Sequence, residues 1–526
     1  MTSILKYLNR ALLVLLLAAF AACSDNEGGN ESNGNGDDGN TETPADGDTY
    51  GYIKDTNGNP VEGVVVSDGY SCTATDAEGR YALTRNADAG FVFYSLPSAY
   101  KVSVDKTYKL PRFFARLQAG TARYDFTLEA LAAPEKRFDL ICIGDPQINE
   151  ASHAVRFKEE AGREIREYAA SAGVPCYGIT LGDHVNNKWT LFTNMVVALQ
   201  PEQTGVPVFA TIGNHDHEFP TADEKAARAK YESYFGPVDY SFNRGDVHVV
   251  SMDNVIHSCK ASADYEGGFT AAQYEWLKQD LSFVPKDKMV ILCVHIPFRG
   301  GWGTNSAHAD ADKYYDEVLD LLSQYEYAAI MSAHTHSNIN YIHRKNGKEI
   351  FEHVTGTTCG AWWRSTVCTE GTPIGFGLYR IDDNRMEEWA YRSVRHDEQF
   401  QIRLYRASDT FVGGAKYRFK QTGADQIVAN IWNWDPSWTV NVYENDVLSG
   451  QMTRNSDIDA WTVAYHIGLL NNTDSYRKSS DHMFHYTLKN PAAAVRVEAI
   501  DRFGNKYEQT VFTDPAEHPG DFHADF

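Results

Sequence analysis

The sequence predicts an α/β domain flanked by two β-rich domains. In the central part of the chain, apolar strand-like runs alternate with polar loops and amphipathic helix patterns, as in βαβ-type layers. On both sides of it, short β-like runs are separated by turn residues. The length of 526 residues also exceeds what one hydrophobic core supports, so we expect three folded domains.

Residues 1–22 have the pattern of a secretory signal peptide. A basic start precedes an apolar run that is too short to span a membrane as a mature helix. The run ends in Phe20-Ala21-Ala22-Cys23, which resembles the lipobox of bacterial lipoproteins, where the cysteine is acylated. Residues 23–49 are rich in Gly, Asn, Asp and Glu and predict a flexible tether. We therefore expect an exported lipoprotein of the outer membrane or cell surface, or otherwise a periplasmic protein.

Residues 50–131 predict a small β-sandwich. Turn signals at Asn57-Gly58, Asp68-Gly69 and Glu78-Gly79 separate the β-like runs. The stretch 51–66 is similar to transthyretin-like modules that precede catalytic domains in exported hydrolases. The segment contains no catalytic constellation, so we expect a spacer or docking role for it.

The central domain is expected over residues 132–395, and a β-rich C-terminal domain over 396–526. After residue 395 the helix patterns fade, and aromatic β-like runs return around Trp432 and Trp461. The helix patterns of the central domain lie at 151–172, 189–200, 221–235, 270–282 and 310–324.

Five apolar runs of the central domain each end in residue types that commonly serve as metal ligands. A Gly-Asp after a strand is usually only a turn, and a lone histidine there is more often a core or surface residue. The ordered set is improbable by chance, because ligands at the carboxyl ends of neighbouring strands converge on one crevice. Its oxygen and imidazole donors suffice for two ions. In chain order, the runs end at Asp145-Pro-Gln147, Gly-Asp183, Gly-Asn214-His215-Asp216, His295 and His334-Thr-His336.

This order of motifs resembles the calcineurin-like metallophosphoesterases over about residues 138–395, and the flanking domains resemble those of an exported bacterial subgroup. The resemblance implies a β-sandwich flanked by helices and the hydrolysis of phosphate esters by a water that two divalent ions share. His215 would protonate the leaving group, and Asp216 would fix the tautomer of His215. One ion would be held by Asp145, Gln147, Asp183 and His336, and the other by Asp183, Asn214, His295 and His334, with Asp183 bridging.

Two departures from the family pattern bear on the metals. Position 147 usually carries His, whereas Gln147 offers a neutral oxygen that suits hard ions, so we favour Mn²⁺ or Mg²⁺ over Zn²⁺ or Fe. Purple acid phosphatases carry a tyrosine ligand three residues after the bridging aspartate, and here that residue is Asn186. The sequence therefore argues against a tyrosinate-bound iron centre.

The expected substrate is a small-molecule, lipid-linked or glycan-linked phosphate monoester or diester. Arginine would clamp the phosphate and tryptophan would stack on a ring or sugar, although ordinary loop packing is an equal alternative for each residue. The 48 basic and 71 acidic side chains give a formal charge of −23, which disfavours duplex nucleic acid as a partner. The candidate substrate contacts are Arg299, Trp302, Trp362, Trp363 and Arg364.

Two other functions remain open from the sequence. One is a non-catalytic surface lipoprotein that binds glycans through its aromatic β-domains, and the other is a protein phosphatase. The intact set of metal ligands disfavours the first, and the exported setting disfavours the second. The oligomeric state stays open, and Cys359 and Cys368 are the one cysteine pair that we would test as a disulfide.

The lipobox-like segment predicts that Cys23 tethers the protein to a membrane. Replacing it, Cys23→Ala, should block processing or release the protein into the soluble fraction, because two acyl chains are needed for stable anchoring. Membrane fractionation and mass spectrometry of the N-terminus measure this. A wild-type protein without lipid, together with a variant that still fractionates with membranes, would refute the lipid anchor.

Overall fold

The computed structural model describes residues 47–299, 313–409, 423, 425–472 and 478–513. The predicted signal peptide, Cys23 and Trp302 lie outside these residues. Among the helices of the described residues, none combines the length and the apolar character needed to cross a membrane.

The N-terminal β-domain consists of two sheets, as expected for a small sandwich. One sheet has the strand order β4-β1-β7 and the other the order β3-β2-β5-β6. The strands are β1 (Thr49–Asp55), β2 (Val65–Ser67), β3 (Cys72–Ala74), β4 (Arg80–Leu83), β5 (Phe91–Tyr94), β6 (Phe114–Arg116) and β7 (Phe126–Leu128).

The first sheet of the central domain has five strands in the order β10-β9-β8-β19-β20. β8, β9 and β10 run parallel, so their carboxyl ends reach the same edge. All six residues of β9 are buried, which explains why this strand is a continuous apolar run in the sequence. The strands are β8 (Arg137–Ile143), β9 (Cys176–Leu181), β10 (Val208–Thr211), β19 (Gly375–Asp382) and β20 (Arg385–Ser393).

The second sheet of the central domain has six strands in the order β11-β12-β15-β16-β18-β17. β12, β15, β16 and β18 run parallel, and β15 is buried along its whole length. A separate hairpin pairs β13 (Val255–His257) with β14 (Tyr265–Gly267). The strands of the sheet are β11 (Tyr240–Arg244), β12 (Val247–Ser251), β15 (Met289–Cys293), β16 (Tyr327–Ser332), β17 (Ile339–Lys345) and β18 (Lys348–Val354).

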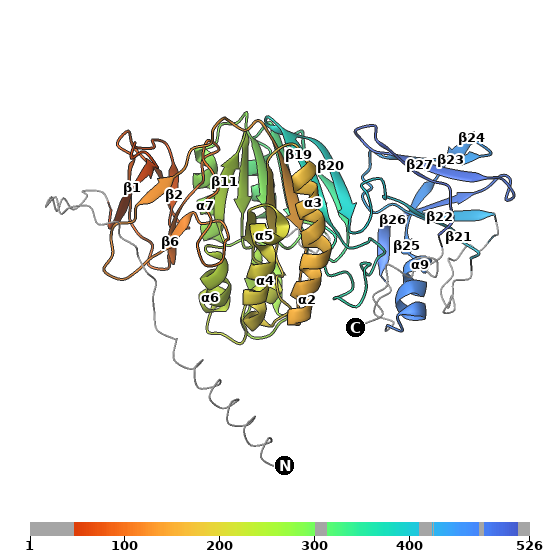
Figure 1. Cartoon of the computed structure of the whole chain (residues 1–526), viewed down its shortest axis with the longest axis horizontal. Helices are drawn as coiled ribbons and strands as arrows, with labels where there is room; N and C mark the ends of the chain where they lie inside the picture. The colour runs from red at the N-terminus through yellow and green to blue at the C-terminus, as the bar shows by residue number, and fades with distance from the viewer. Residues whose placement is uncertain (1–46, 300–312, 410–422, 424, 473–477, 514–526) are drawn as a thin grey trace, which may run out of the picture. The chain divides into compact units, whose positions relative to one another are not determined.

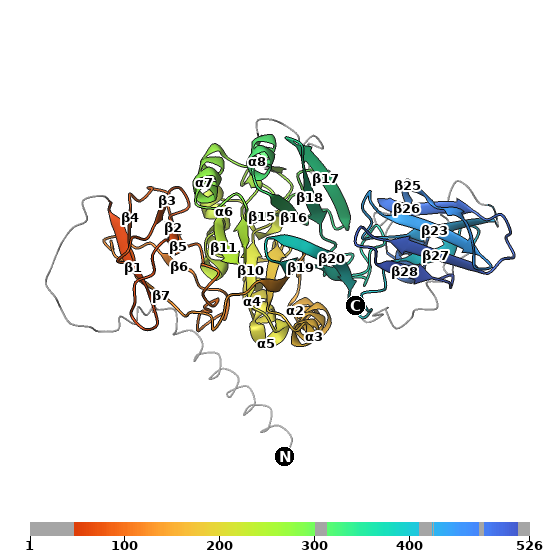
Figure 2. The ribbon, with the colours of Figure 1, turned by 90° about the horizontal axis from the view of Figure 1, so that it is seen from above.

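Helices cover the two central sheets from opposite sides. Seen from above, α7 and α8 lie on one side and α2, α3 and α5 on the other, with the strands between them (Figure 2). Six of the helices in this domain lie within the predicted ranges, whereas α5 follows the predicted range 189–200 and was not predicted. A π-helical turn over Lys158–Gly162 also separates α2 from α3. The helices are α2 (Ala151–Phe157), α3 (Arg163–Ser171), α4 (Phe192–Leu199), α5 (Pro201–Thr204), α6 (Glu224–Phe235), α7 (Ala271–Ser282) and α8 (Tyr315–Leu322). Figure 1 shows α3, α4 and α5 in front of the strands.

The C-terminal domain contains two four-stranded antiparallel sheets, β21-β22-β26-β25 and β24-β23-β27-β28. It also contains a helical segment that the sequence pattern did not predict, α9 (Ala460–Val463), continued by a π-helix over Ala464–Leu469. The side chain of Asp459 caps this segment by accepting the N–H of Trp461. The strands are β21 (Arg403–Arg406), β22 (Gln426–Asn430), β23 (Thr439–Glu444), β24 (Val447–Gln451), β25 (Thr453–Ile458), β26 (Ser479–Thr487), β27 (Val495–Ile500) and β28 (Lys506–Gln509).

Polar side chains join the N-terminal β-domain to the central domain. The indole N–H of Trp276, which is fully buried on α7, donates to Ser67 Oγ at 3.0 Å. Ser241 and Ser95 form a second buried contact, at 2.9 Å. Side chains of both domains also contribute to one hydrophobic cluster.

The cysteine pair singled out from the sequence is not joined in the structure. Cys359 and Cys368 are both buried free thiols. The thiol of Cys359 donates to Gly360 O at 3.7 Å, and that of Cys368 lies 3.5 Å from Thr357 Oγ1. Each sulfur therefore has a neighbouring oxygen as its partner.

Candidate metal centre

The strand ends of both central sheets deliver the predicted ligands to one place. The loops after β8, β9 and β10 carry Asp145, Gln147, Asp183 and Asn214, and the loops after β15 and β16 carry His295, His334 and His336. All seven side chains are buried, with exposures between 0% and 8%. The structure thus assembles a buried cluster of oxygen and imidazole donors from five parallel strand ends.

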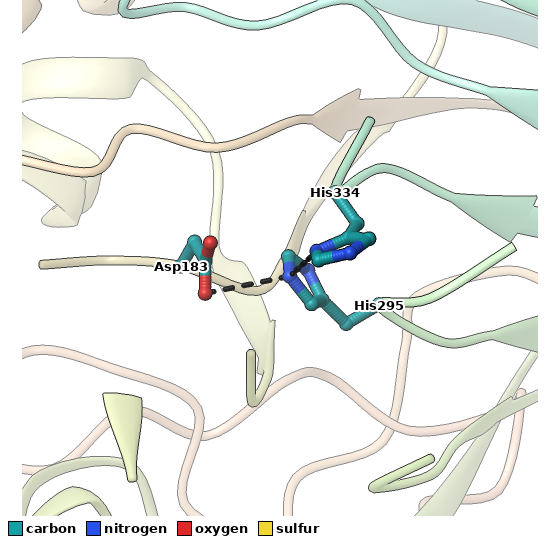
Figure 3. Close-up of side chains that lie close together, drawn as sticks. All are labelled: Asp183, His295 and His334. Atoms are coloured by element: carbon teal, nitrogen blue, oxygen red, sulfur yellow. Dashed lines mark hydrogen bonds and ion pairs between the residues drawn. The ribbon is translucent and has the colours of Figure 1, made fainter. Parts of the chain in front are cut away.

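The cluster divides into two groups that share one carboxylate. Ligand atoms of Asp183, His295 and His334 lie within 4.8 Å of one another, and so do those of Asp145, Asp183 and His336. His295 Nε2 lies 3.4 Å from Asp183 Oδ1 and 3.1 Å from His334 Nδ1 (Figure 3). The two groups correspond to the two sets that the family resemblance implied, with Asp183 in both.

The two amide ligands complete these groups. Asn214 Oδ1 lies 2.9 Å from His295 Nε2, on the side of the first group. Gln147 Nε2 donates to Asp183 Oδ2 at 3.2 Å, on the side of the second group. Each group therefore has an amide oxygen beside its carboxylate and imidazole donors, which is a donor set for hard or borderline divalent ions.

Five of the seven candidate ligands have a left-handed backbone, which non-glycine residues rarely adopt. This conformation turns the chain sharply just after a strand, so that a side chain projects across the strand end. Such strain persists only where the surrounding structure enforces it, and it concentrates at functional sites. The residues are Asp145 (φ 39°), Gln147 (φ 37°), Asp183 (φ 53°), His334 (φ 65°) and His336 (φ 54°).

Two glycines make room for this arrangement. A Cβ atom on Gly213 would lie 2.2 Å from Asp183 N and 2.4 Å from Asp183 Oδ1. A Cβ atom on Gly182, whose φ is +94°, would lie 2.5 Å from His295 Nδ1. Any larger residue at either position would displace a ligand, which explains why Gly precedes both Asp183 and Asn214.

Outer hydrogen bonds fix which nitrogen of two histidines faces the cluster. His295 Nδ1 donates to Leu181 O at 2.7 Å, because a carbonyl oxygen can only accept, and this leaves Nε2 for the cluster. His334 directs Nδ1 into the cluster, and its Nε2 lies 3.3 Å from the hydroxyl of Tyr265 on β14. Tyr265 was not predicted, because nothing in its polar surroundings in the sequence distinguishes it from a loop tyrosine.

Unsatisfied oxygens show that the residues fit a cation. Asp145 Oδ1 and Gln147 Oε1 are buried and have no hydrogen-bond partner among the described residues. Burial raises the pKa of the Asp145 carboxyl well above its usual range. Burial also opposes ionisation of Asp183, but His295 and His215 outweigh it and hold the pKa of that carboxyl below its usual range. Divalent ions would satisfy both oxygens and offset the cost of burying two carboxylates.

His215 lies beside the cluster, but its partner is not the predicted one. Its Nδ1 donates to Asn187 Oδ1 at 2.9 Å, and its Nε2 is 4.0 Å from Asp183 Oδ2. The side chain is 23% exposed, whereas the side chain of Asp183 is 2% exposed, so His215 borders the open side of the site. Asn187 is the residue that orients His215, and only its place in the loop after Asp183 could have suggested it.

The prediction that Asp216 fixes the tautomer of His215 is wrong. The carboxylate of Asp216 is fully buried and binds His184 instead, at 2.9 Å from Nδ1 and 2.8 Å from the backbone N–H. It also accepts the N–H groups of Val185 and Gly213. Asp216 therefore ties the loop after β9 to the loop after β10. The short 3₁₀ turn over Asn214–Asp216 points successive side chains in different directions, which separates His215 from its neighbour.

The candidate substrate contacts differ in their surroundings. The half-buried ring of Trp362 lies 4.9 Å from the ring of His336, with φ 52°, so Trp362 borders the cluster. Trp363 is 2% exposed, stacks on His153 and donates to Pro146 O at 2.8 Å, so it is a packing residue and its prediction as a substrate contact is wrong. Arg299 is exposed and lies over Tyr341, and Arg364 is also exposed.

Three family models match successive parts of the chain. "N terminal of Calcineurin-like phosphoesterase" matches residues 48–131, "Calcineurin-like phosphoesterase" matches 124–338, and "C terminal of Calcineurin-like phosphoesterase" matches 352–507. The catalytic model spans β8 to His336, so it includes all seven predicted ligands.

Curated relatives are similar to only part of the chain. Purple acid phosphatase 23 of Arabidopsis thaliana is 26% identical over 181 residues, which are 31% of this chain and 36% of that protein. Purple acid phosphatase 18 of the same plant is 25% identical over 182 residues, 32% of this chain and 38% of that protein. The matches thus span little more than a third of either relative.

Among solved structures, purple acid phosphatase PPD1 from yellow lupin seeds is 14% identical, with a TM-score of 0.36 and coverage of 50% of this chain and 53% of that chain. The 5'-nucleotidase precursor from Thermus thermophilus is 10% identical, with a TM-score of 0.30 and coverage of 49% and 54%. These similarities are too distant to identify a substrate.

The shared carboxylate predicts that Asp183→Asn lowers the affinity for both metal ions. Loss of one negative charge and one ligand oxygen should weaken Mn²⁺ binding by about 100-fold or more, since removal of an outer partner alone typically costs 10- to 100-fold. Titration calorimetry of the metal-free protein and elemental analysis measure this.

Asp216→Asn is the matched control, because this carboxylate lies next to the cluster without belonging to either group. It should keep the metal content but lower the free energy of unfolding by about 1–3 kcal/mol, since an amide cannot accept from all four N–H donors. Full metal content in Asp183→Asn, or loss of both ions in Asp216→Asn, would contradict the assignment.

Proposed function

This chain belongs to the calcineurin-like phosphoesterases, and we propose that it hydrolyses phosphate esters with the help of two divalent metal ions. The observation that carries the proposal is the pair of buried ligand groups that share Asp183, with His215 on the open side of the site. In this proposal, His215 acts as a proton donor beside a site for two cations. Phosphoryl transfer needs both, because charge develops on the phosphoryl oxygens and on the leaving group.

The residues of the chain have separate tasks in this proposal. Bound divalent ions would supply Lewis acidity, which withdraws charge from the phosphoryl oxygens and acidifies water. Asp183 fixes the site between both groups of ligands and also accepts the backbone N–H of His215 at 2.9 Å. Asn187 holds the Nδ1–H of His215, so a proton that His215 gives up leaves from Nε2, the nitrogen nearer to Asp183.

We also propose which metal ions the protein binds and where in the cell it acts. We infer Mn²⁺ or Mg²⁺ rather than Zn²⁺ or iron, because Gln147 contributes an oxygen and Asn186 stands where a purple iron site has tyrosine. We also infer that the chain acts outside the cytoplasm, anchored through Cys23, which rests on the sequence of residues 1–49 alone.

The proposed substrate is a small phosphate ester, with a lipid-linked or glycan-linked ester as a further candidate. Trp362 borders the metal groups next to His336 and is half-buried, so it is the aromatic side chain best placed among the predicted contacts to meet the organic part of a substrate. The exposed Arg299 and Arg364 remain candidates for contact with its outer part. The net charge of −23 supports a substrate other than duplex nucleic acid.

The two alternative functions, a non-catalytic glycan-binding protein and a protein phosphatase, predict different results in the same assay. The purified protein should hydrolyse bis-p-nitrophenyl phosphate or p-nitrophenyl phosphate when Mn²⁺ or Mg²⁺ is added, and lose this activity on chelation. A glycan-binding protein without catalysis would hydrolyse neither ester with any of Mn²⁺, Mg²⁺, Zn²⁺ or Fe²⁺. A protein phosphatase would prefer phosphopeptides to both esters by a large margin.

His215 as the acid predicts a dependence on the leaving group. His215→Asn should slow the hydrolysis of alkyl phosphate esters by about 10²- to 10⁴-fold, because a basic alkoxide needs a proton to depart. Esters of p-nitrophenol should be slowed much less, so the variant steepens the dependence of kcat on leaving-group pKa. Bound metal, measured by elemental analysis, should stay near the wild-type level.

Two results would contradict this role. Equal losses for both kinds of ester with metal retained would indicate that His215 stabilises the phosphoryl oxygens instead. A loss of metal would show that His215 is itself a ligand.

A further inference from the structure

A lysine of the C-terminal domain reaches the metal-binding loop of the central domain. Lys478 immediately precedes β26, and its Nζ donates to the backbone carbonyl of Thr335. Thr335 lies between the two ligands His334 and His336, so the ammonium group is anchored at the centre of the His-Thr-His motif.

Other contacts hold the C-terminal domain against the same loop. Asn338, two residues after His336, is fully buried and donates from Nδ2 to Trp432 O at 2.8 Å. Asn340 donates to Asn433 O at 2.9 Å. Both asparagines are at most 5% exposed, so these contacts between the two domains are buried. Lys478 therefore approaches a loop that other buried contacts also join to the C-terminal domain.

The buried carboxylate of Glu370 accepts several hydrogen bonds near the same loop. Glu370 is 1% exposed and accepts the backbone N–H of Asn338 at 2.9 Å. It also accepts the backbone N–H and the hydroxyl of Thr372, at 2.8 and 2.6 Å, and lies 3.7 Å from His482. Glu370 thus belongs to a hydrogen-bonded network that connects the His-Thr-His loop with β26.

We propose that Lys478 is a positioning residue of the active site that the C-terminal domain supplies, and that its positive charge favours binding of the phosphoryl anion at the metal centre. The proposal rests on the phosphoesterase function proposed above. The ammonium group contacts the backbone between His334 and His336 and is half-buried, so water screens its charge less than at an exposed position. It attracts an anionic phosphoryl group and repels divalent cations, so its two effects on the site have opposite signs.

These opposite signs separate a charge effect from a merely structural one. If Lys478 only supports the loop, its loss disorders both His334 and His336, and the affinities for metal and for phosphate fall together. If its charge acts on the site, its loss weakens the binding of phosphate while the affinity for metal stays the same or rises. The loss of one positive charge near a bound anion corresponds to a change of about tenfold in the affinity for phosphate.

The test uses the whole mature protein and three substitutions at one position. Lys478→Arg keeps the charge and the donor, Lys478→Gln keeps a donor without the charge, and Lys478→Met removes both. Lys489→Met is the matched control, because Lys489 also belongs to the C-terminal domain and donates to a backbone carbonyl, that of Ser449, outside the metal-binding loop. Calorimetry measures Mn²⁺ binding to the metal-free protein and inorganic phosphate binding to the Mn²⁺-loaded protein.

We expect Lys478→Gln and Lys478→Met to weaken phosphate binding by about tenfold without weakening Mn²⁺ binding. Lys478→Arg and Lys489→Met should behave as the wild type. Wild-type phosphate affinity in Lys478→Gln, or a joint loss of Mn²⁺ and phosphate affinity in Lys478→Met, would overturn the proposal. A Mn²⁺-loaded wild-type protein that neither binds phosphate nor hydrolyses any ester would overturn the proposed function as well, whereas an active wild type with unaffected Lys478 variants overturns this inference alone.

Discussion

The carboxylate of Asp183 lies between ligands that two different sheets deliver, and the geometry of the site depends on it. His295 approaches one oxygen from the second sheet, and Gln147 donates to the other from the first. The backbone N–H of His215 is held by the same carboxylate. A movement of this one side chain would therefore shift both candidate metal groups and the proposed acid together, which explains the tight packing of Gly182 and Gly213 around it.

The site is built at a cost in folding free energy. Each residue that is held in the left-handed region costs on the order of 1 kcal/mol or more, and five ligands adopt it. The buried carboxylates of Asp145 and Asp183 add a further desolvation cost. The continuous apolar strands that carry the ligands offset this cost, and metal ions that bind only the folded chain would stabilise it further by mass action. Strain, buried charge and metal affinity are therefore linked properties of one set of residues.

The sequence was most informative about the site where candidate ligands directly follow buried strands. A buried parallel strand is a continuous apolar run, so the residues after it are identifiable. The seven candidate ligands were selected in this way and by family resemblance, and the structure brings their side chains together. The contacts of Asn187, Tyr265 and Lys478 were not predictable, because each joins a loop to a distant segment without a repeating pattern. The partner of Asp216 was mispredicted for a related reason, since adjacency in the motif said nothing about the direction of a side chain in a 3₁₀ turn.

The aromatic residues of the C-terminal domain bear on the choice between an enzyme and a glycan-binding protein. A binding surface needs exposed rings, but Trp432, Trp438 and Trp461 are 0%, 9% and 4% exposed. The half-buried Trp434 is covered by Arg454, whose guanidinium lies 4.6 Å from the ring centre. These rings form the core of their own domain, and the backbone of Trp432 anchors the loop that carries His334 and His336. Within the described residues, these four tryptophans are therefore explained by packing, and Trp432 links its domain to the loop of His334 and His336.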